Sequence, residues 1–155
     1  MIDLTGVQYI AKGSFGMYFL HPTIPGAGLK VYHDIFTSGE LVRSSESYES
    51  AEMEFRWLLD LENSGITPKA YHLDIVKIGN IYHVAICMEH IDGDVLGDIE
   101  KDEDVTNDIT RDLRCYLREM FGVIHHDLHP RNVIVTKDKN FKVIDFGPDF
   151  IDKVA

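Results

Sequence analysis

The closing stretch GVIHHDLHPRNVIVTKDKNFKVIDFG, residues 122–147, constrains the fold more than any other part of the sequence. Two apolar runs rich in valine and isoleucine, NVIV and FKVID, flank a short polar segment, which is the pattern of a tight β-hairpin. Pro130 keeps the residues just before the first run from forming a helix. A hairpin of this length brings Asn132 and Asp145 to the same end of the strand pair.

The polar residues at that end of the hairpin predict a site built from oxygen ligands. Asn132 and Asp145 could share one hard cation, because such ions prefer carboxylate and amide oxygens. Asp127 lies five residues before Asn132 and would then accept a proton from an attacking hydroxyl group.

A competing hypothesis for the same stretch is a zinc site, because imidazole rings are common zinc ligands and three histidines lie within five residues. The three are His125, His126 and His129. The first and last of them would share a face only on a helix, and no cysteine or HExxH pattern lies nearby. The sequence therefore favours oxygen ligands over zinc at this end of the hairpin.

Length and composition fit one soluble globular domain. The chain has 155 residues, of which 45% are hydrophobic and 26% are charged. The formal net charge of −11 argues against a general nucleic-acid-binding protein, because neutralising phosphates requires Lys and Arg. No apolar run approaches the roughly 18 residues of a membrane helix, and the first residues lack the pattern of a secretory signal. We therefore expect a cytoplasmic protein without a membrane partner.

The chain has two cysteines, Cys87 and Cys115, and each lies in an apolar pattern. We expect both to be buried free thiols in a reducing compartment, because disulfides are rare in cytosolic proteins. A disulfide between them is the alternative.

Hydrophobic periodicity predicts a mostly β N-terminal part. Two apolar runs around a glycine-bearing turn, a short third run and a later hairpin that turns at Gly79 predict five strands. From Tyr48 the apolar residues recur at helical spacing until Gly65, which predicts one helix between the third and fourth strands. The Ser-rich residues before it are expected to form a loop or the frayed start of this helix. The expected strands lie within residues 7–20, 27–33 and 71–91.

The C-terminal part is predicted to be shorter and mixed. Residues 92–105 are acidic and contain glycine, which predicts a linker with a short helix. Residues 106–121 place apolar side chains on one face of a second helix, which Thr106 or Asn107 can cap. A loop and the closing hairpin follow, so the expected fold class is α+β.

Three further features precede the closing stretch. Gly13 and Gly16 lie in the turn between the first two strands, where backbone N–H groups can approach phosphate oxygens without a Cβ atom in the way. Lys30 lies in the middle of the apolar third strand and becomes informative if a carboxylate can meet it. Glu54 on the following helix is the candidate, and a Lys–Glu pair would hold the lysine toward a phosphate.

In this order, these features resemble the protein kinase superfamily. They are a glycine-bearing hairpin, a third-strand lysine, a helix glutamate, an H-x-D-x-x-x-x-N loop at 125–132 and D-F-G at 145–147. Five elements at compatible spacings are far more specific than any one of them. The resemblance extends from about Tyr9 to Gly147.

The resemblance implies a bilobal kinase-like fold of a single domain, residues 1–155. Residues 1–91 would form an N-lobe with a five-stranded sheet and one helix. Residues 92–155 would form a much reduced C-lobe with a helix, the catalytic loop and a β-hairpin. The implied activity is that of an ATP- and Mg²⁺-dependent protein kinase, which transfers the γ-phosphate to Ser or Thr hydroxyls of a protein substrate, with Mn²⁺ as an alternative metal.

Carried over to this chain, the resemblance implies a role for each motif residue. Asp127 resembles the catalytic base, and His125 is then interpreted as a structural residue that braces the loop. Lys30 would contact the α- and β-phosphates and pair with Glu54, whose spacing fits the family better than that of Glu52. The metal ligands would be Asn132 and Asp145. The residues implied to bind ATP are Gly13, Ser14, Gly16, Lys30, Met88 as the gatekeeper, Glu89, Ile91 and Ile134.

The chain departs from the family pattern at several positions. Ala11 replaces the first glycine of the loop, and Tyr18 stands where the family usually has the valine that covers adenine. Either the loop is one residue shorter or the pocket is altered there. His126 replaces the arginine of H-R-D, and the D-L-H-P wording is closer to aminoglycoside phosphotransferases and other atypical kinases. No A-P-E segment follows Gly147.

These departures leave the partners and two alternatives open. A protein substrate would dock through an unusual surface, and a homodimer or a partner protein would cover the reduced C-lobe. One alternative is a small-molecule phosphotransferase of the sugar or aminoglycoside type. The other is a catalytically silent, nucleotide-binding pseudokinase that acts by docking to a partner. The small size resembles that of kinases carried by viruses or injected by bacteria, which would place the protein in the cytoplasm of a host cell.

Overall fold

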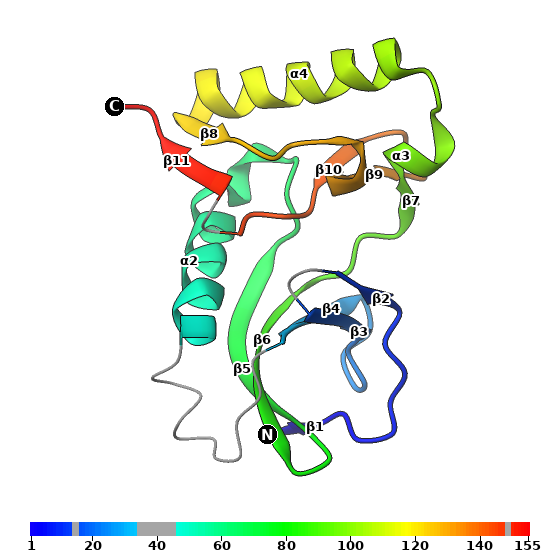
Figure 1. Cartoon of the computed structure of the whole chain (residues 1–155), viewed down its shortest axis with the longest axis vertical. Helices are drawn as coiled ribbons and strands as arrows, with labels where there is room; N and C mark the ends of the chain where they lie inside the picture. The colour runs from blue at the N-terminus through cyan, green and yellow to red at the C-terminus, as the bar shows by residue number, and fades with distance from the viewer. Residues whose placement is uncertain (14–15, 34–45, 148–149) are drawn as a thin grey trace. The chain divides into compact units, whose positions relative to one another are not determined.

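The computed structural model describes residues 1–13, 16–33, 46–147 and 150–155. These residues form two compact units (Figure 1). The first unit contains Met1–Leu59 and Lys69–His90, and the second contains Asp60–Pro68 and Ile91–Ala155. The segment 60–68, which the sequence-based division places in the N-lobe, thus packs with the second unit. Within the described ranges, no helix combines the length and the apolar character needed to cross a membrane.

The first unit is built on a sheet that has six strands within the described residues, in the order β1-β5-β6-β4-β3-β2. The five strands expected from the sequence are all present. The additional strand, β1, was not predicted because it is only two residues long and pairs in parallel with β5. The bounds are β1 Ile2–Asp3, β2 Ala11–Lys12, β3 Gly16–Leu20, β4 Ala27–Tyr32, β5 Ala70–Ile78 and β6 Ile81–Glu89.

Strand β4 lies inside this sheet, between β3 and β6, and it is buried along its whole length. Its side chains alternate between the two faces of the sheet. Leu29 and Val31 join an apolar cluster on one face, so Lys30 and Tyr32 point to the other. The other members of the apolar cluster are Leu4, Phe19, Ala27, Val76, Ala85 and Cys87.

Helix α2, Glu46–Asp60, is the predicted helix, and it begins two residues before Tyr48. Its buried residues, Ala51, Glu54 and Leu58, follow one another at spacings of three and four, as on the inner face of an amphipathic helix. Most of the Ser-rich segment before the helix lies outside the described residues.

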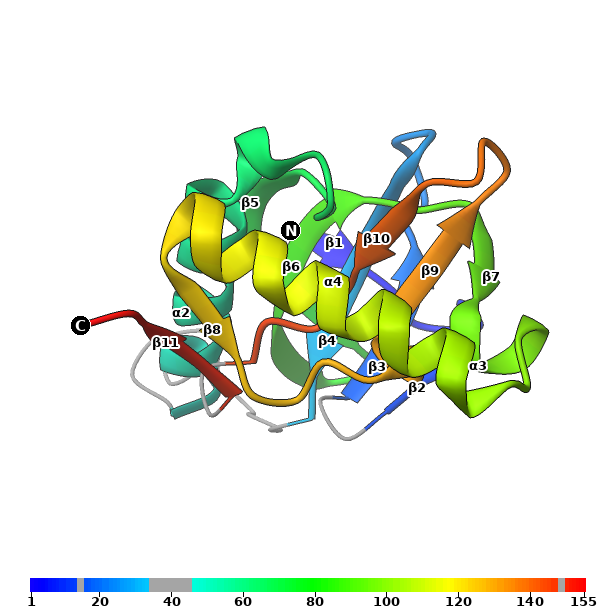
Figure 2. The same ribbon diagram turned by 90° about the horizontal axis from the view of Figure 1, so that it is seen from above.

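The second unit contains a long helix, which crosses the foreground of Figure 2, and two small sheets. Over the described residues, one sheet has the order β10-β9-β7 and the other pairs β11 with β8. The β9–β10 hairpin is the one predicted from the closing stretch. The bounds are η1 Glu62–Ser64, β7 Gly93–Val95, α3 Leu96–Ile99, α4 Glu103–Phe121, β8 Val123–His125, η2 Pro130–Asn132, β9 Val133–Thr136, β10 Phe141–Val143 and β11 Ile151–Lys153.

The long helix α4 begins earlier than the sequence predicts. Asp102 is its N-cap and accepts a hydrogen bond of 3.0 Å from the backbone N–H of Asp104. Both expected caps, Thr106 and Asn107, lie inside the helix instead, and Thr106 donates to the carbonyl of Glu103. The misplacement arises because the helix starts with a polar first turn, which carries no apolar signal. Gly122 ends the helix in the left-handed conformation, with φ of 66°.

The two cysteines differ in their surroundings. Both are free thiols, as expected, but only Cys87 is buried as predicted. Cys115 is exposed because it lies two residues from each of the buried positions Leu113 and Leu117, on the opposite side of α4.

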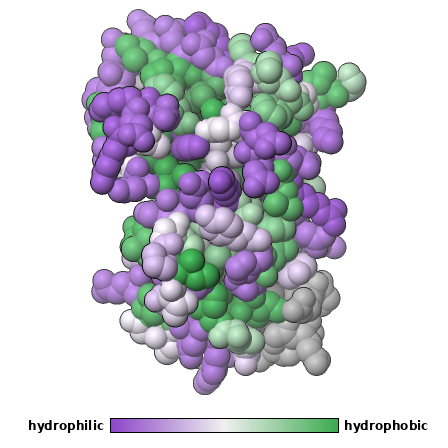
Figure 3. Space-filling model, turned by 180° about the vertical axis from the view of Figure 1, so that it is seen from behind, coloured by the Kyte–Doolittle hydropathy of each residue, from purple (hydrophilic) through white to green (hydrophobic). Residues whose placement is uncertain are grey.

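On the face shown in Figure 3, hydrophilic side chains are interspersed with hydrophobic ones on both units.

A thiol reagent should therefore distinguish the two cysteines. In the folded protein we expect rapid labelling of Cys115 alone, because Cys87 is enclosed in the apolar cluster. Absorbance after addition of DTNB, with and without denaturant, measures the two reactivities. Cys115→Ser should remove the fast reaction. A second thiol that reacts as fast in the native protein would contradict the burial of Cys87.

Candidate active site

The first part of the candidate site is a buried ion pair in the first unit. Lys30 on β4 is 5% exposed and Glu54 on α2 is fully buried. The Lys30 Nζ atom lies 2.8 Å from each carboxylate oxygen of Glu54. Tyr32, two residues along the same strand, also donates its hydroxyl to the Glu54 Oε1 atom. Glu52, the rejected alternative, instead forms a surface ion pair with Arg56.

A buried pair of this kind is weak support for stability. Removing two charges from water costs free energy, and apolar residues of similar volume are often as stabilising or more so. The pair does fix the lysine cation at one position on the inner strand β4, since both carboxylate oxygens and the neighbouring Tyr32 hydroxyl hold it. The pair therefore fixes the position of the Lys30 charge more than it stabilises the fold.

Tyr18 is packed against a glycine of the neighbouring strand. Tyr18 lies on β3, where it pairs with Lys30 of β4, and its hydroxyl lies 3.1 Å from the Nδ1 atom of His90. The two rings stack at a centroid distance of 5.8 Å. A Cβ atom at Gly28 would lie 1.8 Å from the Tyr18 hydroxyl, so the tyrosine needs glycine at that position. Burial raises the pKa of Tyr18 to about 12, with a smaller contribution from Cys87.

The glycine turn has a structural requirement of its own. Gly16 adopts φ of 147°, and a Cβ atom there would lie 2.0 Å from the carbonyl oxygen of Val31. The backbone N–H of Gly13 donates to the carbonyl of Gly16 at 3.0 Å, which closes the turn. Close approach to β4 is thus enough to explain Gly16, and its role toward phosphate stays a prediction. Ser14 lies outside the described residues.

The remaining residues predicted to bind ATP lie in both units. Met88 and Glu89 end β6, where Met88 is 4% exposed and pairs with Gly28. Ile91 and Ile134 belong to the second unit, where Ile134 lies on β9.

The second part of the candidate site is a hydrogen-bonded loop in the second unit. His125, 2% exposed, donates from its Nε2 atom to the carbonyl of Asp145 at 2.5 Å. Its Nδ1 atom accepts the backbone N–H of Asp127 at 3.1 Å. Because one nitrogen donates and the other accepts, the ring is neutral, and its burial lowers the pKa of His125. His125 thus holds the Asp127 and Asp145 segments together, which is the bracing role expected from the sequence.

The same loop orients Asn132 and Asp145. The amide nitrogen of Asn132 donates to the carbonyl of Asp127 at 3.0 Å, which leaves its oxygen as the atom that can meet a cation. The Oδ1 atom of Asp145 accepts the backbone N–H of Gly147 at 3.1 Å. An amide oxygen and a carboxylate are hard ligands, and this donor set fits Mg²⁺ or Mn²⁺.

The zinc hypothesis for the three neighbouring histidines is wrong. Their ring nitrogens face three different partners, since His125 contacts the Asp145 carbonyl, the Nε2 atom of His126 lies 2.9 Å from an oxygen of Asp152, and the Nδ1 atom of His129 accepts the Arg131 N–H. Each ring thus has its partner on a different segment of the chain.

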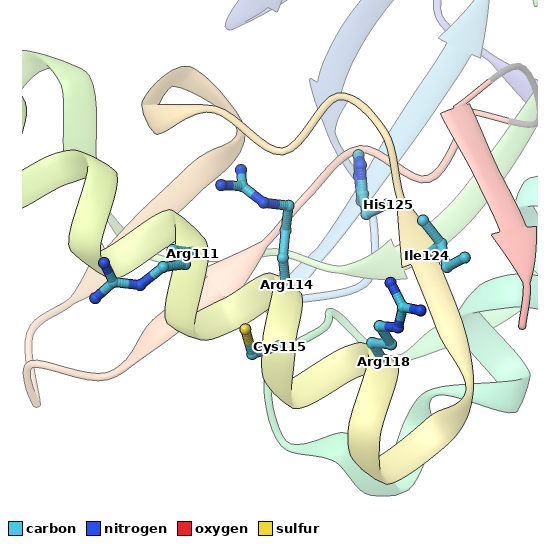
Figure 4. A pocket seen from close by; sticks show the side chains of 6 residues that line it. All are labelled: Arg111, Arg114, Cys115, Arg118, Ile124 and His125. Atoms are coloured by element: carbon cyan, nitrogen blue, oxygen red, sulfur yellow. The ribbon is translucent and has the colours of Figure 1, made fainter.

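A cavity of about 220 Å³ lies between α4 and β8 (Figure 4). The Nη1 atom of Arg114 donates to the carbonyl of Leu128 at 2.8 Å, so this arginine supports the loop between Asp127 and Asn132. The sequence does not single out Arg114, because an arginine on a polar helix face is ordinary. The lining residues are Arg111, Arg114, Cys115, Arg118, Ile124 and His125.

Comparison with known proteins gives consistent results. The family described as ABC1 atypical kinase-like domain matches residues 33–149. A probable serine/threonine-protein kinase of Dictyostelium discoideum is 26% identical over 158 residues, which are 94% of this chain and 22% of that protein. The stress-activated protein kinase JNK of Suberites domuncula is 32% identical over 91 residues, which are 49% of this chain and 25% of that protein. The chain thus spans about a quarter of the length of these relatives.

Among solved structures, WbdD in complex with the kinase inhibitor LY294002 matches 92% of this chain with a TM-score of 0.60 and 21% identity. The match covers 32% of that chain. It confirms the predicted kinase-like α+β fold. Over the described residues, the sheet of the first unit has six strands in place of the five expected.

The neighbouring histidines His125 and His126 allow a matched test of the loop. His125→Ala should lower the free energy of unfolding by at least about 2 kcal/mol, because two part-buried backbone groups lose a partner at about 1–3 kcal/mol each. His126→Ala removes only an exposed pair with Asp152, so it should change stability little. Urea unfolding followed by circular dichroism measures both values. Equal effects of the two substitutions would contradict the bracing role of His125.

The contact between Tyr18 and Gly28 predicts a rescue. Gly28→Ala should destabilise the protein by about 1–3 kcal/mol, because the added methyl group overlaps the tyrosine hydroxyl. In a Tyr18→Val background the same alanine should cost less than about 0.5 kcal/mol, since valine does not reach that position. A double-mutant cycle from urea midpoints measures this coupling. Additive effects would show that the tyrosine does not require glycine there.

Proposed function

The chain belongs to the ABC1 atypical kinase-like domain family, and on that premise we propose that it is an ATP- and Mg²⁺-dependent protein kinase acting on Ser or Thr hydroxyls. The observation that carries the proposal is the buried ion pair of Lys30 and Glu54, since a buried lysine held by a helix carboxylate provides a fixed cation for phosphate oxygens. The similarity to a probable serine/threonine-protein kinase supports the choice of substrate.

Each residue of the ion pair has a separate task in this proposal. Lys30 would contact the α- and β-phosphates with its Nζ atom. Glu54 would keep that atom in place by accepting hydrogen bonds with both carboxylate oxygens. Tyr32 would add a donor to the same carboxylate, which keeps Glu54 satisfied when Lys30 also contacts phosphate.

In the second unit, Asp127 would orient the substrate hydroxyl and accept its proton. Its side chain is 40% exposed, so a substrate can reach it, and its Oδ2 atom lies 3.7 Å from the Nε2 atom of His129. Asn132 and Asp145 would hold Mg²⁺ or Mn²⁺ through oxygen atoms. Such an ion, when bound, neutralises charge on the phosphate oxygens.

Several finer points belong to this proposal. The glycine turn, the end of β6 and strand β9 would contact the nucleotide, through Gly13, Ser14, Gly16, Met88, Glu89, Ile91 and Ile134. A protein substrate would dock through an unusual surface, and a second copy or another protein could cover part of the second unit. A location in the cytoplasm, of the producing cell or of a host, stays a prediction.

A transfer assay with radiolabelled ATP and Mg²⁺ tests the proposal on generic protein substrates. Asp145→Ala and Lys30→Ala should each lower phosphate transfer at least about 100-fold, as expected for the loss of one charged group that stabilises the transition state. Glu54→Gln should lower kcat/KM by a similar factor, because Lys30 loses its ionised partner. Glu52→Gln, two residues away on the same helix, should leave the rate unchanged.

The acceptor of the label separates the proposal from its alternatives. Label on protein that disappears in Asp145→Ala supports a protein kinase. Label only on added sugars or aminoglycosides would replace it with a small-molecule phosphotransferase. ATP binding without transfer to any acceptor would leave a nucleotide-binding module that acts through a partner.

A further inference from the structure

Three side chains with metal-binding atoms meet on the sheet of the first unit, outside the candidate active site. His72 and Asp74 lie on β5, and Cys87 lies on the neighbouring strand β6. One ligand atom from each, a nitrogen, an oxygen and a sulfur, all lie within 4.8 Å of one another. They face the side of the sheet where Cys87 packs in the apolar cluster, which is the side opposite to Lys30.

A break in the pairing of β5 and β6 brings these residues together. Ala70 pairs with Met88, but His72 rather than Tyr71 pairs with Cys87. The extra residue is a β-bulge, and bulges commonly redirect side chains at sites. In a regular ladder Tyr71 would stand opposite Cys87, and the imidazole ring would be displaced from the thiol. The bulge thus brings a nitrogen, an oxygen and a sulfur atom close together.

The carboxylate of Asp74 has a buried oxygen atom that lacks a hydrogen bond from any residue that the structure describes. Its Oδ2 atom is buried, and no hydrogen-bond donor within the described ranges reaches it. The Nε2 atom of His72 lies 2.8 Å from this oxygen, which is the distance of an ion pair, but the two atoms do not form a hydrogen bond. Buried carboxylate oxygens without a donor are rare, because they lose hydration without replacement. A cation shared by the oxygen and the ring nitrogen removes this cost.

We propose that His72, Asp74 and Cys87 bind one divalent transition-metal ion, for which Zn²⁺ is the best fit. Zinc takes nitrogen, oxygen and sulfur ligands in tetrahedral geometry, whereas hard ions such as Mg²⁺ avoid thiolates. His72 is 49% exposed, so water can supply the fourth ligand. Binding converts the Cys87 thiol to a thiolate and releases its proton to the solvent.

The geometry needs a modest adjustment to hold the ion. Zinc bonds of about 2.0–2.3 Å place tetrahedral ligand atoms about 3.3–3.6 Å apart. Atoms within 4.8 Å of one another reach that arrangement when the widest pair closes by about 1 Å. The half-exposed side chain of His72 can supply this movement, while Cys87 stays in the cluster. The ion would then connect β5 to β6 one residue before Met88, and this holds whether or not the chain transfers phosphate.

Cobalt titration of the full chain in a Cys115→Ser background tests the proposal, because Cys87 is then the sole thiol. We expect one equivalent of Co²⁺ to produce a thiolate-to-cobalt absorption band in the near ultraviolet, and Zn²⁺ to abolish it by displacement. Excess Mg²⁺ should not compete, which separates this site from the oxygen ligands at Asn132 and Asp145. Cys87→Ala should eliminate the band.

A second variant keeps the test valid if Cys87→Ala unfolds the protein. His72→Ala alters a half-exposed residue and should weaken Zn²⁺ binding at least about 10-fold, as measured by competition with a chromophoric chelator. His126→Ala, a change at an exposed histidine of the second unit, should leave the affinity unchanged. No cobalt band, or equal Zn²⁺ affinity in His72→Ala and the parent protein, would overturn the proposal and leave His72 and Asp74 as an ion pair beside a buried thiol.

Discussion

A buried lysine can keep its charge only if another group compensates for the lost hydration, and in the first unit that group is Glu54. The requirement reaches well beyond the two residues. It fixes the distance between β4 and α2, it explains why Glu54 is the polar member of an otherwise apolar helix stripe, and it gives the Tyr32 hydroxyl its partner. An inner strand that carries a charge is costly to keep, so the charge itself is the part of the arrangement that selection for folding alone does not explain.

In the second unit, hydrogen bonds of a neutral side chain, rather than an ion pair, hold the loop and the end of the hairpin in place. His125 contacts a backbone N–H on one side and a backbone carbonyl on the other, so the loop and the end of the hairpin keep one register. The carboxylates of Asp127 and Asp145 are thereby positioned through their own main chains. A neutral, buried imidazole suits this task because it can donate and accept at once.

The closing hairpin follows from its own apolar runs, whereas the choice of Glu54 as the partner of Lys30 and the bracing role of His125 rest also on the resemblance to protein kinases. The features that were missed depend on distant contacts. In the sequence, Gly28 is indistinguishable from an ordinary strand residue. Its role becomes clear only from the structure, where Tyr18 of the next strand packs on it. The short strand β1 is likewise defined only by its pairing with β5. The exposure of Cys115 is the exception, because it follows from the local periodicity of the helix, two residues from Leu113 and from Leu117. Arg114, Tyr32 and the β-bulge at Tyr71 have no local signature at all, because each acts on a segment far along the chain or through register.

Two carboxylates of the first unit differ in whether hydrogen-bond donors reach their oxygen atoms. This difference, rather than burial, distinguishes a structural carboxylate from a candidate metal ligand. Glu54 is fully buried and accepts hydrogen bonds from Lys30 and Tyr32, so its charge is balanced within the protein. Asp74 is less buried, yet its Oδ2 atom meets no donor in the described part of the chain and faces a nitrogen and a sulfur instead. The two sites also differ in ligand chemistry, since Asn132 and Asp145 offer oxygen alone and the cluster at Cys87 includes a thiol. A hard and a borderline-soft cation would therefore bind at separate places in this chain without competing.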